Sequence, residues 1–189
     1  EHYAEETYFG VYSRRFGQKL RSARRRIDLL RSYQPTGRLL DIGCGLGDTL
    51  IAAREAGYDA SGLDIGAYPV QHCQELGFEV RQASVTDTGL AAESFDLVTM
   101  WDVLEHIPRT ADGLREVARV LKPGGVLGLI VPSGGYLRAC LFRNTYQNYR
   151  GLWARTHFVY HNSRTLSRVL VSCGLQPLPF PLVHRGALC

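Results

Sequence analysis

The residues best placed for chemistry in this sequence are three alternating glycines flanked by acids. Gly43, Gly45 and Gly47 lie between Asp41 and Asp48, directly after an apolar run and at the start of a predicted helix. Glycine permits a tight turn and lets a ligand approach the bare backbone. The first N–H groups of a helix have no partners within the helix, so they suit a carboxylate or a phosphate. The segment therefore predicts a ligand-binding loop.

The positions of the acids indicate which ligand suits this loop. The pattern is G-x-G-x-G followed by Asp48, so the dinucleotide fingerprint G-x-G-x-x-G is not matched. Asp41 precedes the first glycine, where it would meet the ammonium of an amino-acid moiety and repel a pyrophosphate. Asp64 follows the glycines by about 20 residues, a spacing at which a carboxylate accepts hydrogen bonds from ribose hydroxyls. The combination favours an adenosine ligand that carries an amino acid over a nicotinamide dinucleotide.

Alternating strands and helices must position these residues. Short apolar runs predict strands at 38–42, 59–63, 78–81, 95–100 and 126–131, with a proline-broken strand at 176–184. Helical spacing of apolar residues predicts helices at 14–33, 48–56, 69–76, 111–121 and 162–173. The alternation predicts an α/β fold with a Rossmann-like, doubly wound, mostly parallel sheet and helices on both faces, in three α/β/α layers. Its ligand crevice is expected at the carboxyl ends of the strands.

Five segments together resemble the class I S-adenosylmethionine-dependent methyltransferases, in particular the ubiquinone-biosynthesis O-methyltransferase-like group of small-molecule enzymes. They are Leu-Leu-Asp-Ile-Gly-Cys-Gly-Leu-Gly (39–47), Gly-Leu-Asp-Ile (62–65), Ser-Phe-Asp-Leu-Val (94–98), Leu-Glu-His-Ile-Pro (104–108) and Leu-Lys-Pro-Gly-Gly (121–125). The resemblance implies in-line methyl transfer from S-adenosylmethionine to a small-molecule acceptor, at oxygen or nitrogen, with S-adenosylhomocysteine as the product. It also implies one domain over 1–189: an N-terminal helical lid (1–35), a cofactor-binding core (36–131), a substrate-region insertion (132–161), and a last helix and strand (162–189).

The same resemblance assigns the cofactor contacts. They are expected from Asp41, Gly43, Cys44, Gly45, Asp64, Ile65, Ser84, Val85, Trp101 and Asp102. The glycine loop would hold the methionine end, the acid at 64 the ribose, and Ile65 the adenine. The family often has an Asp near position 84, so Ser84 would replace its contact with the adenine amino group, with Val85 adding backbone contact. Trp101 and Asp102, just after the fourth predicted strand, would lie near the sulfonium.

Two histidines are candidates for removing a proton from the acceptor. His106 follows the fourth strand, and His157 lies in a segment similar to the family's His-containing segment before its last helix. A neutral imidazole near pH 7 suits proton abstraction, although a hydrogen-bonded structural role is the alternative for each. Some relatives carry a divalent-metal site where this chain has Asp102, Glu105 and His106. Only three ligands are visible and adjacent residues rarely converge without a turn, so no metal is expected.

Aromatic residues in two segments are candidates for the acceptor site. Tyr8 and Phe9 lie in the N-terminal segment, and Tyr136 and Trp153 lie in the insertion after the fifth strand. Such side chains would frame a planar or apolar acceptor, or they would pack as ordinary core.

Composition and charge limit the other functions. The chain has 45% hydrophobic and 21% charged residues, and its five scattered cysteines form no C-x-x-C pair. These features favour a globular cytoplasmic protein without a disulfide framework or a cysteine zinc site, and no apolar run is long enough to cross a membrane. Net charge is +4, with arginines crowded in residues 14–31. We expect a solvated helix face there, so nucleic acid is not an expected partner, although an acidic partner such as RNA is the alternative.

Two further functional hypotheses follow from the same patterns. The chain could be a catalytically silent subunit that binds S-adenosylmethionine, or a methyltransferase acting on RNA or protein.

The family normally ends with a further hairpin strand, whereas only residues 185–189 follow the last predicted strand here. Either the C-terminus is truncated or the sheet is one strand short. An exposed sheet edge would favour a homodimer or covering by a partner.

Overall fold

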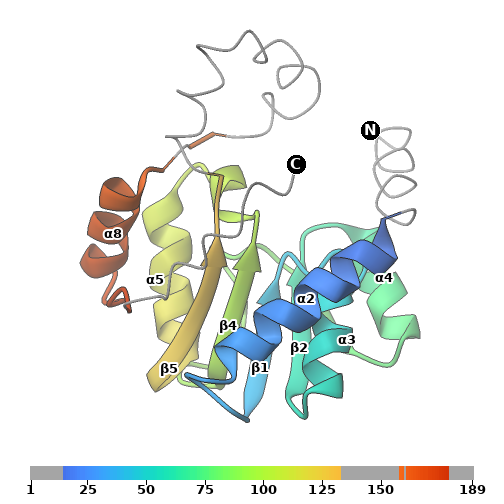
Figure 1. Cartoon of the computed structure of the whole chain (residues 1–189). Coiled ribbons are helices and arrows are strands. Elements are labelled where there is room, and N and C mark those ends of the chain that lie inside the picture. Colours follow the sequence, from blue (N-terminus) through green and yellow to red (C-terminus); the bar gives the residue numbers. More distant parts are fainter. Residues whose placement is uncertain (1–14, 133–157, 160, 179–189) are drawn as a thin grey trace, which may run out of the picture.

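Five strands form one parallel sheet in the order β3-β2-β1-β4-β5 (Figure 1). The computed structural model describes residues 15–132, 158–159 and 161–178. The strands are β1 (Arg38–Ile42), β2 (Asp59–Asp64), β3 (Glu79–Gln82), β4 (Phe95–Trp101) and β5 (Leu121–Ile130). The helices are α2 (Phe16–Leu30), α3 (Asp48–Glu55), α4 (Ala67–Glu75), α5 (Thr110–Val120) and α8 (Ser163–Ser172), together with the short 3-10 helix η1 (Leu104–His106).

The strand order reverses between β1 and β4, which makes their carboxyl ends the switch point of the sheet. Chain order runs outward from β1 to β2 and β3 on one side, then returns to β4 and β5 on the other. In open parallel sheets the ligand crevice lies outside the carboxyl ends at this point. The parallel register sets Asp41 of β1 between Gly62 of β2 and Thr99 of β4. The glycine loop after β1 is therefore at the expected ligand position.

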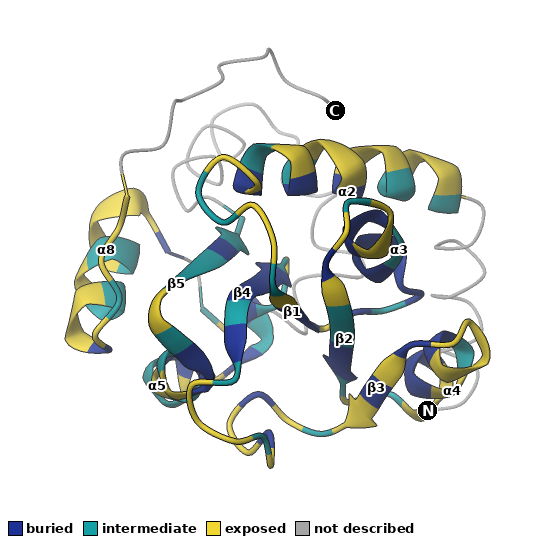
Figure 2. Cartoon of the chain, turned by 90° about the horizontal axis from the view of Figure 1, so that it is seen from below, coloured by how far each residue is buried: buried dark blue, intermediate teal, exposed yellow. Residues whose placement is uncertain are grey.

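Helices cover both faces of the sheet, so the predicted three-layer fold is confirmed (Figure 2). On one face α2 and α3 pack over Leu39 and Leu97. On the other face α5 and α8 pack over residues that alternate with these, among them Leu40 and Val98. Because β1 and β4 are covered on both faces, they are apolar almost throughout, as the sequence predicted.

The helix in the expected N-terminal lid forms part of the core. Ala23, Ile27 and Leu30 are spaced by four and three residues along α2, and each is buried. Two of its arginines make contacts within the chain: Arg24 pairs with Glu55 at 2.7 Å, and the Arg26 guanidinium lies 5.0 Å from the centre of the Trp101 ring. The described part of 1–35 is thus a structural layer, and residues 1–14 lie outside the described residues.

Most predicted bounds lie within three residues of the observed ones, and two predicted strands differ by more. The fifth strand begins at Leu121 rather than at 126, because Leu121 already pairs with Phe95 of β4. The register then shifts, and regular pairing resumes between Leu97 and Val126, so Pro123-Gly124-Gly125 lies within the irregular part of the strand. Residues 176–178 of the last predicted strand form no strand, and 179–184 lie outside the described residues. Of the predicted insertion 132–161, only 132, 158–159 and 161 are described. Among the described helices, none has the length and apolar character that crossing a membrane requires.

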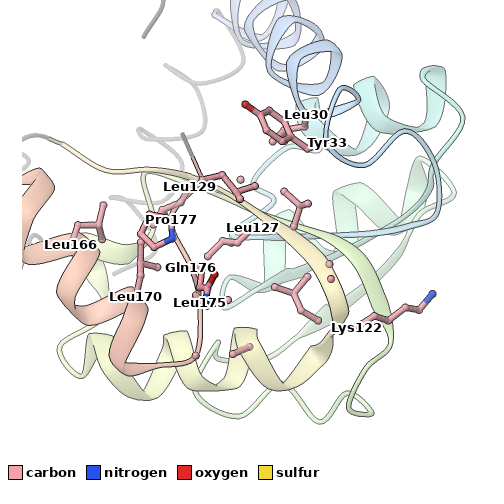
Figure 3. Close-up of a pocket in the computed structure, with 18 of the residues that line it drawn as sticks. Leu30, Tyr33, Lys122, Leu127, Leu129, Leu166, Leu170, Leu175, Gln176 and Pro177 are labelled. Atoms are coloured by element: carbon pink, nitrogen blue, oxygen red, sulfur yellow. The ribbon is translucent and has the colours of Figure 1, made fainter. Parts of the chain in front are cut away.

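A hollow of about 1110 Å³ runs along the outer edge of β5 between α2 and α8 (Figure 3). Leucines from the strand and both helices line it: Leu30, Leu127, Leu129, Leu166 and Leu170. Of the predicted cofactor contacts only Trp101 reaches it. The hollow is therefore a feature of the sheet edge and is distinct from the crevice at the glycine loop.

Candidate functional site

The glycine loop is tied to the end of β2 and approached closely by the chain that follows β4. The Gly43 N–H donates to the Leu63 carbonyl at 2.7 Å, which continues the strand pairing into the loop. Gly43 has φ +73°, and a Cβ there would lie 2.5 Å from Cγ2 of Val103. Only glycine fits both the conformation and the space. The loop is consequently held against the switch point of the sheet.

Asp64, at the end of β2, is oriented by the loop it faces. Its Oδ2 accepts a hydrogen bond from the Gly45 N–H at 3.0 Å, and its Oδ1 accepts one from the Gly66 N–H at 2.9 Å. A carboxylate oxygen has more than one acceptor position, so both oxygens can still accept from ribose hydroxyls. Ile65 is 76% exposed beside it. Its exposed apolar side chain is available to a ligand, and its contact with adenine stays a prediction.

Asp41 is a buried acid whose described partners are hydroxyls. Its side chain is 2% exposed and accepts a hydrogen bond from Thr99 Oγ1 at 2.6 Å. Burial raises the pKa of Asp41 to about 8; the nearby acids Asp48 and Asp64 push the pKa up, and hydrogen bonds from Thr99 and Thr49 push it down. No ion pair to Asp41 is present within the described ranges. A cation delivered by a ligand would stabilise the charged carboxylate.

Cys44, another predicted cofactor contact, directs its thiol into the core, and its contact with a cofactor stays a prediction. The residue is 2% exposed and belongs to the apolar cluster that Val80 and Cys73 form between α3, α4 and the sheet. A Cβ on Gly62 would lie 3.0 Å from the Cys44 sulfur, so the thiol is pressed against β2. Burial and a hydrogen bond with Cys73 raise the pKa of the Cys44 thiol.

The segment expected at the adenine follows β3. The exposed Ser84 hydroxyl hydrogen-bonds with Thr86 Oγ1 at 2.9 Å, and a bridge between Ser84 and Asp87 closes the turn. The Val85 side chain is buried in the core, which leaves its backbone for a ligand contact. Contact of these two residues with adenine stays a prediction.

The side chain of Trp101 and that of Asp102 leave the end of β4 differently. The Trp101 ring packs on the α2-covered face, under Arg26 and against Gly128, where a Cβ would lie 3.0 Å from the ring. Asp102 is exposed and has φ +54°, a conformation that non-glycine residues rarely adopt and that often occurs at functional sites. The acid, rather than the indole, is therefore the one turned towards solvent at the strand end.

Glu105 is a buried carboxylate that the sequence indicated only as a member of a metal set. It is 1% exposed, and neither carboxylate oxygen has a hydrogen-bond partner within the described residues. Burial raises the pKa of Glu105. Its backbone carbonyl accepts a hydrogen bond from the Phe158 N–H at 2.8 Å, so the segment next to His157 reaches the end of β4. The sequence feature that could have indicated a buried acid is the position of Glu105 between the apolar Leu104 and Ile107.

The remaining candidates separate into described and undescribed residues. His106 is half-buried in η1 and makes at least one interaction. Within the described ranges, no three His, Cys, Asp or Glu side chains converge as metal ligands would, and this includes Asp102, Glu105 and His106. The geometry thus gives no support to the metal-site interpretation. The other predicted catalytic and acceptor residues lie outside the described residues: Tyr8, Phe9, Tyr136, Trp153 and His157.

These features fit the cofactor that the sequence predicted. S-adenosylmethionine carries two positive charges, an ammonium and a sulfonium, beside a ribose and an adenine. The crevice holds a buried acid without a described cation and a second acid fixed by two N–H donors, with an exposed isoleucine next to it. A pyrophosphate would instead meet repulsion from Asp41, Asp48 and Asp64. The fold and this site define a class I S-adenosylmethionine-dependent methyltransferase domain.

Comparison with known proteins gives the family. A family model described as "Methyltransferase domain" matches residues 12–179, and the chain belongs to this family. The ubiquinone biosynthesis O-methyltransferase of Stutzerimonas stutzeri (strain A1501) is 37% identical over 95 residues, which are 47% of this chain and 41% of that protein. The chain thus spans less than half the length of this curated relative.

Solved structures share the fold at low identity. A methyltransferase from Thermotoga maritima aligns with a TM-score of 0.68 and 21% identity, over 89% of this chain and 78% of that one. One from Archaeoglobus fulgidus aligns with a TM-score of 0.69 and 22% identity, over 88% and 74%. Both are S-adenosylmethionine-dependent methyltransferases by their descriptions, and the likeness establishes the fold.

Proposed function

We propose that this protein transfers a methyl group from S-adenosylmethionine to an oxygen, or alternatively a nitrogen, of a small-molecule acceptor. The observation that carries the proposal is the buried Asp41 carboxyl beside the glycine loop, held by hydroxyls with no described cation. This charge pattern suits a ligand with an ammonium group. The relative named a ubiquinone biosynthesis O-methyltransferase supports oxygen as the methylated atom.

The chain's own residues have three tasks in this reaction. When bound, S-adenosylmethionine supplies a sulfonium whose methyl group is already activated. Asp41 and the first N–H groups of α3 would bind the methionine end, while Asp64 and Ile65 would orient the adenosine. Fixing the two reactants in line would lower the barrier by roughly 7–11 kcal/mol. The remaining task is to take a proton from the acceptor.

His106 is the first candidate for that proton, which one of its ring nitrogens would accept from the acceptor's hydroxyl. A base in position adds roughly a hundred- to ten-thousand-fold to the rate. His157 is the second candidate, because its neighbour Phe158 donates a hydrogen bond to the Glu105 carbonyl at 2.8 Å. Acceptor contacts from Tyr8, Phe9, Tyr136 and Trp153 belong to the same proposal.

Calorimetric titration tests the cofactor first. We expect roughly micromolar binding of S-adenosylmethionine and S-adenosylhomocysteine, and none of NADH. Asp64→Ala should abolish binding. Asp59→Ala is the matched control, because Asp59 is an exposed acid at the opposite end of the same strand. Retained binding in Asp64→Ala, or equal loss in both variants, would contradict the proposed site.

A panel of small phenols and catechols, with radiolabelled methyl transfer as the readout, then tests the reaction. Cofactor binding without turnover on any acceptor would favour the silent subunit. Labelling of RNA or protein instead would favour a macromolecular substrate.

A further inference from the structure

Thr99 is a buried hydroxyl aimed at the acid that the proposed cofactor site depends on. It lies on β4 directly beside Asp41 of β1 and is 0% exposed. Its Oγ1 donates to Asp41 Oδ1 at 2.6 Å. The residues on either side of it in β4 are apolar, Val98 and Met100, so one polar side chain interrupts a buried strand at this position.

The groups around Asp41 leave its charge uncompensated in the described residues. The hydroxyls of Thr99 and Thr49 are neutral partners. The strongest charge effects on the pKa of Asp41 come from two other acids, Asp48 and Asp64, and the Cys44 thiol is also nearby. Lys19 of α2 acts on Asp48 and Asp102 instead. A buried carboxylate of this kind is stabilised in its charged form when a cation arrives.

We propose that Thr99 is a positioning residue for the amino group of the bound cofactor, because its hydroxyl fixes the Asp41 carboxyl in the orientation that receives the ammonium. The inference rests on the proposed function. Threonine suits the task because its χ1 is restricted and its strand position is fixed by pairing on both sides. Its hydroxyl is neutral, so it orients the carboxyl without cancelling the charge that the ligand needs.

The test compares two ligands that differ in the amino-acid part. S-adenosylhomocysteine carries the ammonium, whereas 5′-methylthioadenosine keeps the adenosine and the sulfur without it. Thr99→Val should weaken S-adenosylhomocysteine on the order of 10- to 100-fold, the loss expected for one hydrogen bond to a charged group. Binding of 5′-methylthioadenosine should stay within about two-fold. Thr99→Ser, which keeps the hydroxyl, should restore most of the affinity for S-adenosylhomocysteine.

A matched control is available in the chain. Thr88 is also buried, and its Oγ1 donates to Glu116 Oε1 at 2.6 Å, remote in sequence from the glycine loop. Thr88→Val removes an equivalent hydrogen bond and should leave the affinities for both ligands unchanged. This variant separates a local effect on the amino group from general loosening of the fold.

The pH dependence of binding gives a readout that a structural role would not move. The pKa of Asp41 is raised to about 8, so ligand binding near neutral pH requires the carboxyl to lose a proton. The affinity for S-adenosylhomocysteine should therefore rise up to about tenfold per pH unit below that pKa, and that for 5′-methylthioadenosine should not. In Thr99→Val the rise should move to higher pH, because a hydrogen bond that lowers the pKa is gone.

Each outcome decides between the two proposals. Equal weakening of both ligands by Thr99→Val, or no weakening of S-adenosylhomocysteine, would overturn the role of Thr99 while leaving the cofactor site intact. Failure of the unmodified protein to bind either ligand would reject the proposed function itself, and this inference with it.

Discussion

Replacing Gly43 by alanine tests whether the loop is held as tightly as its geometry indicates. Two costs add at this position. The φ of +73° disfavours a Cβ by roughly 1–2 kcal/mol. The new Cβ would also lie 2.5 Å from Cγ2 of Val103, an overlap that costs about 1–3 kcal/mol if neighbouring groups must shift. We therefore expect Gly43→Ala to lower the free energy of unfolding by roughly 2–5 kcal/mol and to weaken cofactor binding.

The chain provides controls for both terms. Gly57 has φ +91°, and nothing lies within 4 Å of a Cβ there, so Gly57→Ala isolates the backbone term of about 1–2 kcal/mol. Val103→Ala removes the clashing methyl, so combining it with Gly43→Ala should recover about 1–3 kcal/mol beyond additivity. Urea unfolding measures the stabilities, and titration with S-adenosylhomocysteine measures binding. Gly43→Ala as stable as Gly57→Ala, with unchanged binding, would refute this account of the loop.

Three further predictions address single side chains. Ile65→Ala removes a side chain that is 76% exposed, so thermal unfolding should change little while calorimetry shows a cofactor affinity lower by about 1–2 kcal/mol. Glu105→Gln removes a buried carboxylate whose pKa is raised by burial. Because the charged form destabilises the fold, the variant should gain stability relative to the unmodified protein as pH rises from about 4 to 7. Equal stability of the two proteins in urea across that range would contradict this prediction. Hydrogen bonds from Arg119 lower the pKa of Glu116 to about 2. The charged Glu116 therefore stabilises the fold above the pKa that it has in the unfolded chain, and this stabilisation is lost as pH falls towards 2. In Glu116→Gln, the free energy of unfolding measured in urea should fall less steeply with acid.

The sequence predicted those elements whose local residue pattern indicates a single kind of structure. The strand at 38–42 was predicted with its observed bounds, because a short run containing Leu39, Leu40 and Ile42 ends at the glycine loop. The start of β5 was wrong, because Pro123-Gly124-Gly125 is typical of a turn before a strand, whereas here pairing with β4 tolerates it through a shift in register. Local signals of turn chemistry compete with pairing between distant strands, and only the structure shows which prevails.

The acids of the site were predictable, and their partners were not. Spacing alone made Asp41 and Asp64 candidate ligand contacts, and both acids lie next to the glycine loop. Thr99 became significant only once β1 and β4 were known to be neighbours, 58 residues apart in sequence. The face of the sheet on which Trp101 lies could have been predicted. Side chains alternate along a strand, so Trp101 shares a face with Leu97, which packs under α2.

The charge of the crevice gives the cofactor proposal its selectivity. Backbone N–H groups at the start of α3 would suit any anion, including a pyrophosphate, if they acted alone. The acids beside the loop change that preference, because Asp48 and Asp64 disfavour a second anion and the buried Asp41 carboxyl gains a partner when an ammonium arrives. A ligand that brings a carboxylate to the N–H groups and an ammonium to Asp41 satisfies both at once. On the proposed function, the acids around a glycine-rich turn decide whether it selects an amino acid or a dinucleotide, and the hydrogen bond from Thr99 fixes the orientation of the acid nearest the ammonium.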